Sequence, residues 1–72
     1  MNQDEKLRIG DKLKHIHFNI KYTIIEIDIP SQIIHGNYCM IESYNSLFKK
    51  RTNDPLYPRD LVYYKLIMRK IT

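Results

Sequence analysis

The stretch KYTIIEIDI at residues 21–29 decides the fold, because it is rich in strand-forming residues and contains neither glycine nor proline. Its apolar residues do not keep a single alternation. Tyr22 and Ile24 share one parity, whereas the isoleucines at positions 25, 27 and 29 share the other. Such a pattern indicates either a strand buried on both faces or a β-bulge that shifts its phase. The two acids that alternate with the later isoleucines favour the bulge.

Turn signals divide the rest of the chain into further short segments. Strands are predicted over residues 13–18, 38–44 and 47–52, with a stop signal, Asn-Asp-Pro, at residues 53–55. The prolines at positions 55 and 58 predict a single tight helical turn at residues 59–61. The last segment, from Val62 onward, fits two periodicities. Alternation favours a strand, while the spacing of Leu61, Tyr64, Met68 and Ile71 allows a helix.

Composition favours a sheet over a helical domain. The chain has twelve Ile and six Tyr but no Ala, the residue of lowest cost in a helix. Its 72 residues suffice for one small domain. We therefore expect an all-β domain over residues 9–72, a small SH3-like five-stranded barrel with a short helical turn before the last strand, preceded by a polar leader over residues 1–8. The alternative is an α+β fold with a C-terminal helix at about Arg59–Ile71.

Cysteine content and hydropathy bear on where the protein acts. The single cysteine, Cys39, cannot form an internal disulfide, and the polar N-terminal residues do not resemble a signal peptide. Both features predict a cytoplasmic protein. No apolar run approaches the roughly 18 to 20 residues that span a bilayer, so no membrane partner is expected.

Residues for catalysis or metal binding are not grouped in a recognisable pattern. His15 and His17 share one strand face, and His35 with Cys39 could complete a zinc site, but the Cys-x-x-Cys and helical His pairs typical of such sites are missing from the sequence. Nothing in the sequence places a base and an orienting group beside a nucleophile, and the chain's two glycines cannot build a phosphate loop. We expect neither an enzyme nor a metal or other cofactor.

The net charge of +4 arises entirely in the second half of the chain. Residues 1–36 carry five basic and five acidic side chains, whereas residues 37–72 carry seven basic against three acidic. Basic side chains among tyrosines suit an acidic protein surface, and the same residue types bind phosphates and stack on bases. The candidate binding patch comprises Tyr44, Lys49, Lys50, Arg51, Tyr57, Arg59, Tyr63 and Lys65.

Several short motifs resemble those of a known group of proteins. They are Gly10-Asp11, His15, Tyr22 with the following isoleucine pair, the Tyr-rich segment 38–44 and Pro58-Arg59. In this order they resemble small uncharacterised bacterial and phage SH3-like proteins, over about residues 9–64. Residues 18–20, Phe-Asn-Ile, stand where that pattern has a glycine-containing turn. The resemblance implies a fold and no particular activity.

These features together predict a non-enzymatic binding module of bacterial or phage type. Its expected ligand is an acidic protein surface or peptide, docked on a Tyr-rich patch with a basic rim. Single-stranded nucleic acid is the alternative ligand for the same residues. We expect a monomer or a weak homodimer.

Overall fold

The computed structural model describes residues 6–69 of the chain. The first five residues of the expected leader, and Ile71 at the end of the alternative helix, lie outside this range. The elements are β1 (Lys12–His15), β2 (Lys21–Pro30), β3 (Asn37–Asn45), β4 (Lys50–Leu56), the 3-10 helix η1 (Pro58–Tyr63) and β5 (Tyr64–Met68).

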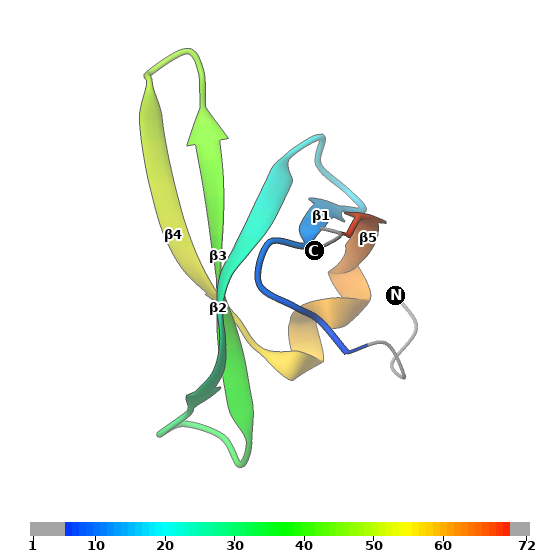
Figure 1. The fold of residues 1–72 in the computed structure, drawn as a ribbon, viewed down its shortest axis with the longest axis vertical. Coiled ribbons are helices and arrows are strands. Elements are labelled where there is room, and N and C mark those ends of the chain that lie inside the picture. The colour runs from blue at the N-terminus through cyan, green and yellow to red at the C-terminus, as the bar shows by residue number, and fades with distance from the viewer. Residues whose placement is uncertain (1–5, 70–72) are drawn as a thin grey trace.

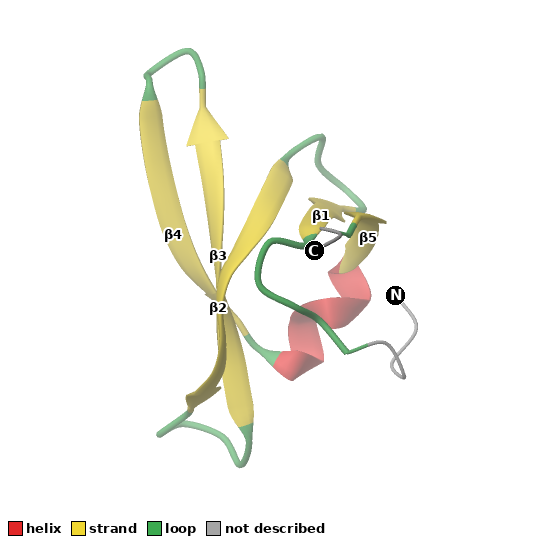
Figure 2. Ribbon diagram, viewed as in Figure 1, coloured by secondary structure: helices red, strands yellow, loops and turns green. Residues whose placement is uncertain are grey.

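The five strands form one antiparallel sheet in the order β4-β3-β2-β1-β5 (Figures 1 and 2). The β3–β4 loop lies at one end of the long axis and the β2–β3 loop at the other, while the β1–β2 loop lies in the same half as the β3–β4 loop, lower and to one side (Figure 1). The mostly β prediction is confirmed, as is a short helical turn before the last strand. The helix η1 is longer than the expected turn at residues 59–61 because Pro58, with its fixed φ, already stands in its first turn. The segment after η1 is a strand, so the alternative C-terminal helix is wrong.

The expected closed barrel is not formed. Closure requires a ladder between the two edge strands, but β4 pairs with β3 and β5 pairs with β1, and within residues 6–69 no ladder joins β4 to β5. The helix η1 occupies the connection between these edges (Figure 2). Because β5 has only five residues and β4 continues along β3, the edges diverge and the sheet stays open.

The fourth strand begins and ends later than predicted. Residues 47–49 belong to the loop, where the Asn45 side-chain oxygen accepts hydrogen bonds from the backbone of Leu47 and Phe48 at 3.0 and 3.3 Å. Lys49 has a φ of +52°, which ends the loop. The expected stop at residues 53–55 lies inside β4, because Pro55 is tolerated in an edge strand where its missing N–H faces no neighbour.

The first strand is shorter than the predicted 13–18. It ends at His15 because the backbone N–H of Ile16 turns away to the carbonyl of Tyr63 at 2.8 Å, and the N–H of His17 bonds to His15 Nδ1 at 3.1 Å. Both bonds take the chain out of the β1–β2 ladder.

The predicted bulge in β2 is confirmed. The pairing of β2 with β3 shifts register between Ile24 and Glu26, and again between Glu26 and Ile29. Asp28 has a φ of +56°, the left-handed conformation that accommodates the extra residue. This irregularity explains why the isoleucines of β2 do not keep one parity.

The buried core is small and lies on one face of the sheet. Each of the first four strands contributes to it, and Leu7, Leu61 and Leu66 pack against its margin. Its fully or nearly buried side chains are Leu13, Ile24, Cys39, Ile41 and Leu56.

One buried ion pair ties the start of the domain to its end. The Asp11 side chain is fully buried, and its Oδ2 accepts a hydrogen bond from Arg69 at 3.1 Å and one from the backbone N–H of Arg8 at 2.9 Å. Arg69 also donates to the backbone carbonyl of Lys6 at 2.8 Å. The carboxylate therefore fixes the segment before β1 against the residue that follows β5.

Candidate functional site

The structure distributes the eight predicted patch residues over separate places. Tyr44, Lys49, Lys50 and Arg51 lie at the loop end of the β3–β4 hairpin, since Tyr44 pairs with Arg51 in the sheet. Lys65 lies on β5, at the opposite edge of the sheet from β4. The eight residues do not form one surface.

The remaining three predicted residues lie around η1. Arg59 places its guanidinium 5.9 Å from the centre of the Tyr57 ring, and that ring lies 5.2 Å from the ring of Tyr38. Tyr63, at the other end of η1, stacks parallel to the His15 ring at 6.1 Å. Both tyrosines make local contacts within the fold.

The strand register creates a different grouping, which we call the basic row. Lys65 pairs with Lys14, and Lys14 pairs with Lys21 across the next strand. The β2–β3 register that pairs Thr23 with Glu42 brings Lys21 beside Tyr44, and Tyr44 pairs with Arg51. Because residues directly opposite in antiparallel strands project to the same face, these side chains form one line across all five strands. The basic row is Lys65, Lys14, Lys21, Tyr44 and Arg51.

Three neighbouring lysines in this row are unfavourable for the isolated protein. Adjacent strands are roughly 4.7–4.9 Å apart, and like charges placed directly opposite destabilise a sheet. Lys14 has a lysine on each side. An anionic group placed over the row would relieve this repulsion.

Shallow hollows border the row. One, of about 630 Å³, is lined by Lys12, Lys21, Thr23, Glu42, Tyr44 and Arg51. A second, of about 550 Å³, is bordered by the β1–β2 loop and the upper part of the β3–β4 hairpin. Lys21 and Tyr44 line both hollows, and the Tyr44 side chain is exposed. A ligand lying in either hollow would therefore meet a cation and an aromatic ring.

The hollow of about 630 Å³ is predominantly positive. Its acid, Glu42, lies 3.8 Å from the Arg51 guanidinium, a separation that leaves a weak ion pair. Lys12 donates a hydrogen bond of 2.6 Å to the Thr23 hydroxyl, which orients its ammonium group across the face. Lys12 and Lys21 are thus available to a ligand.

Charge counting along the sequence missed Lys12, Lys14 and Lys21, since the first half of the chain is neutral overall. Within residues 6–36 of the fold, its acidic and basic side chains are segregated. The acid Asp11 is buried with Arg69, and Glu26 and Asp28 lie in the half of β2 that leads away from the row. The signal available in the sequence is the spacing Lys12-x-Lys14, which places both lysines on one face of a strand.

Two of the histidines considered for a zinc site, His15 and His17, lie in an aromatic cluster. The His15 ring lies 4.8 Å from Phe18 and 5.1 Å from Tyr64, and His17 lies 6.1 Å from Tyr63. Across residues 6–69, no three or more His, Cys, Asp or Glu side chains gather in the way that holds a metal ion.

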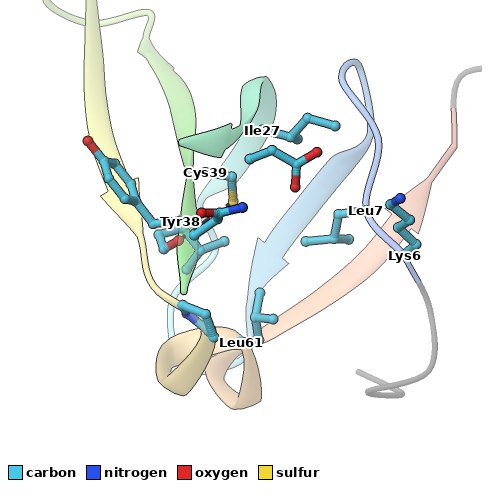
Figure 3. Close-up of a pocket in the computed structure, with 10 residues that line it drawn as sticks. Lys6, Leu7, Ile27, Tyr38, Cys39 and Leu61 are labelled. Atoms are coloured by element: carbon cyan, nitrogen blue, oxygen red, sulfur yellow. Dashed lines mark hydrogen bonds between the residues drawn. The ribbon is translucent and has the colours of Figure 1, made fainter. Parts of the chain in front are cut away.

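Cys39 lies at a small cavity on the core side of the sheet. The cavity has a volume of about 170 Å³, and Figure 3 shows Leu7, Ile27 and Leu61 around it. The thiol donates to the carbonyl of Leu56 at 3.6 Å, and burial raises its pKa. A raised pKa keeps the thiol protonated, which is the state of a packing side chain and not of a nucleophile.

Comparison of the chain with protein-family models, with curated proteins and with solved structures finds no match. In the described part of the chain, no helix has the length and apolar character needed to cross a membrane. Function is therefore argued from the site alone.

Proposed function

We propose that this protein is a non-enzymatic, cytoplasmic binding module that docks an acidic protein surface or peptide on the basic row. The observation that carries the proposal is the pairing of Lys14 with a lysine on each side. A sheet face that keeps this unfavourable arrangement is suited to an anionic partner, whose charge complementarity steers docking and fixes its orientation. The strand order and the single helical turn before the last strand support an open, SH3-like arrangement as its scaffold.

An extended acidic peptide can reach several cations of the row. Alternate side chains of an extended chain project to the same side, about 6.5–7 Å apart, which is wider than the strand spacing of about 4.7–4.9 Å, and the long, flexible lysine side chains span the difference. The hollow that Lys12, Lys21 and Arg51 line gives such carboxylates a place to lie. The Tyr44 ring supplies an apolar surface in the middle of these charges.

Single-stranded nucleic acid is the second candidate, and Tyr44 is the observation that favours it. Tyr44 is 58% exposed and lies between Lys21 and Arg51 in the row. A base could stack on this ring while the flanking cations contact phosphates.

Fluorescence anisotropy with two labelled probes tests the proposal. The probes are a peptide of alternating Glu and Ser, and an oligothymidylate, each titrated at about 50 mM and about 200 mM salt. The double variant Lys14→Gln/Lys21→Gln is expected to weaken peptide binding about 5- to 30-fold, since each contact with an exposed cation is worth up to about 1 kcal/mol. The matched control, Lys6→Gln/Arg59→Gln, removes the same charge away from the row.

The two candidate ligands give different results. Acidic protein docking predicts that the peptide binds and that only the double variant in the row weakens it. Nucleic-acid binding predicts that the oligothymidylate binds more tightly, and that Tyr44→Ala weakens it by about 5- to 100-fold. Equal losses in the double variant and the control would refute a role for the row.

A further inference from the structure

Two loops in one half of the molecule expose large apolar side chains. The β3–β4 loop forms the end of this half, and the β1–β2 loop lies lower in it and to one side (Figure 1). At the tip of the β3–β4 loop, Leu47 is 82% exposed and Phe48 is 70% exposed. The exposed apolar residues of the two loops are Ile16, Phe18, Ile20, Leu47 and Phe48.

Hydrogen bonds and ring contacts hold both loops in shape. The two hydrogen bonds to the Asn45 side chain fix the backbone of Leu47 and Phe48. In the other loop, the Phe18 ring packs against His15, and the backbone N–H of Ile16 is bonded to the carbonyl of Tyr63. The apolar side chains are therefore presented in the free protein, and docking them needs little further ordering of the backbone.

The charge at this end of the molecule is positive. Residues 12–25 and 43–53, which contain the two loops, include no Asp or Glu. Lys49 and Lys50 follow Phe48 directly, and Lys14 and Lys21 flank the β1–β2 loop. Apolar tips beside cations, without acids, are the combination that binds the interface of an anionic bilayer.

We propose that this end of the molecule docks on an anionic lipid bilayer, with Leu47 and Phe48 entering the headgroup region and Lys49 and Lys50 contacting acidic headgroups. This contact differs from a membrane-spanning segment, the mode that the hydropathy of the sequence disfavours. Its apolar anchors, Leu47 and Phe48, lie outside the basic row, which adjoins the β3–β4 loop through the Tyr44–Arg51 pair.

Charge favours a bilayer over the other occupants of such a surface. A second copy of this chain, docked tip to tip, would place Lys49 and Lys50 against the same residues, without an acid to offset them. Peripheral membrane contacts combine lysine and arginine on the polar side with Phe and Leu on the apolar side.

Vesicle binding by the full chain tests the proposal. The vesicles contain phosphatidylcholine alone or an equimolar mixture of phosphatidylcholine and phosphatidylserine, and bound protein is measured by sedimentation. The wild type is expected to bind the mixed vesicles, and Leu47→Ser/Phe48→Ser should lose at least about tenfold in affinity, because two apolar side chains no longer leave water. Lys49→Gln/Lys50→Gln should lose about 5- to 30-fold, at roughly fivefold per charge near the surface.

A control comes from the opposite end of the molecule. Ile33 lies in the β2–β3 loop and is 79% exposed, so Ile33→Ser removes one similarly exposed apolar side chain and should leave vesicle binding unchanged. Because the sequence has no Trp, Phe48→Trp and Ile33→Trp each introduce one fluorescent reporter. Emission of the first variant should shift to shorter wavelength with the mixed vesicles, while that of the second should not move.

Three results would overturn the proposal. The wild type could fail to bind the mixed vesicles even at low salt. The double serine variant could bind as well as the wild type, which would assign the contact to charge alone. Finally, sedimentation equilibrium could show a dimer that Leu47→Ser/Phe48→Ser dissociates, which would identify a second copy as the occupant.

Discussion

Replacing Lys14 by Gln should make the free protein more stable. Lys14 faces Lys65 on one side and Lys21 on the other, and each like-charged neighbour in a sheet costs about 0.2–1 kcal/mol. Removing the central charge eliminates both repulsions while keeping a long polar side chain. We expect the free energy of unfolding to rise by about 0.4–2 kcal/mol. In a domain of this size, about 1 kcal/mol corresponds to about 4–8 °C in Tm.

Lys12→Gln is the matched control for this prediction. Lys12 lies on the same strand, but its direct neighbours across the sheet are Thr23 and Met68, neither of them charged. Its removal relieves no direct repulsion and breaks the hydrogen bond to Thr23. Lys12→Gln should therefore leave stability unchanged or lower it slightly.

Thermal and urea unfolding, followed by circular dichroism at about 0.01 M and about 1 M salt, measures the effect. The gain from Lys14→Gln should be largest at low salt and shrink at high salt, where the Debye length falls to about 3 Å. It should also shrink in a Lys21→Gln background, because the two lysines act on each other. A Lys14→Gln variant no more stable than Lys12→Gln at low salt, or a gain that ignores salt, would refute the reasoning.

Three further predictions concern the rest of the fold. Asp11→Asn should lower the free energy of unfolding by about 2–4 kcal/mol in urea titrations. This is below the usual range for a broken buried ion pair, because the Arg69 side chain is 31% exposed. An unchanged midpoint of urea unfolding would contradict this. Ile24→Ala should cost about 2–5 kcal/mol, since Ile24 is fully buried, and a loss well under this range would show that the core relaxes around the cavity. Burial raises the pKa of Cys39 from its ordinary 9.0 and that of Tyr64 from 10.0. The free energy of unfolding should therefore be highest below about pH 9 and decline as the pH rises further. A free energy of unfolding that increases between pH 9 and 11 would contradict these directions.

Local patterns in the sequence predict the elements of this fold well. The strand over residues 21–29 and the bulge in β2 each follow from a few neighbouring residues. The choice between strand and helix after η1 was settled by tertiary pairing, because β5 completes the sheet against β1. The strand and helix propensities of this segment alone leave both structures open.

Turns held by a side chain, and contacts between distant residues, could not be predicted from these patterns. The loop at residues 46–49 delays β4, because the Asn45 side chain bonds to two backbone N–H groups and so extends the turn. Closure of the sheet depends on whether its two edges meet, which no local pattern specifies. The Asp11–Arg69 pair joins residues 58 positions apart.

The candidate site also combines residues that local sequence reveals with neighbours that only the pairing of strands brings together. Residue types drew attention to Tyr44, Arg51 and Lys65, all of which lie in the basic row. Which lysines join them depends on the register between strands, since a slip of one residue would move Lys14 to the other face. The neutral charge of the first half concealed Lys14 and Lys21, because counting charge along a chain ignores which face each charge occupies.

The most direct measurement of the central claim is a titration of the isotope-labelled protein with the alternating Glu and Ser peptide, followed by amide chemical shifts. Docking on the basic row predicts that the largest shift changes cluster at Lys14, Lys21 and Tyr44 on three neighbouring strands, while the β2–β3 loop around Ile33 stays unmoved. Changes confined to that loop or to η1, or no saturable change at low salt, would contradict the claim that this face of the sheet binds acidic ligands.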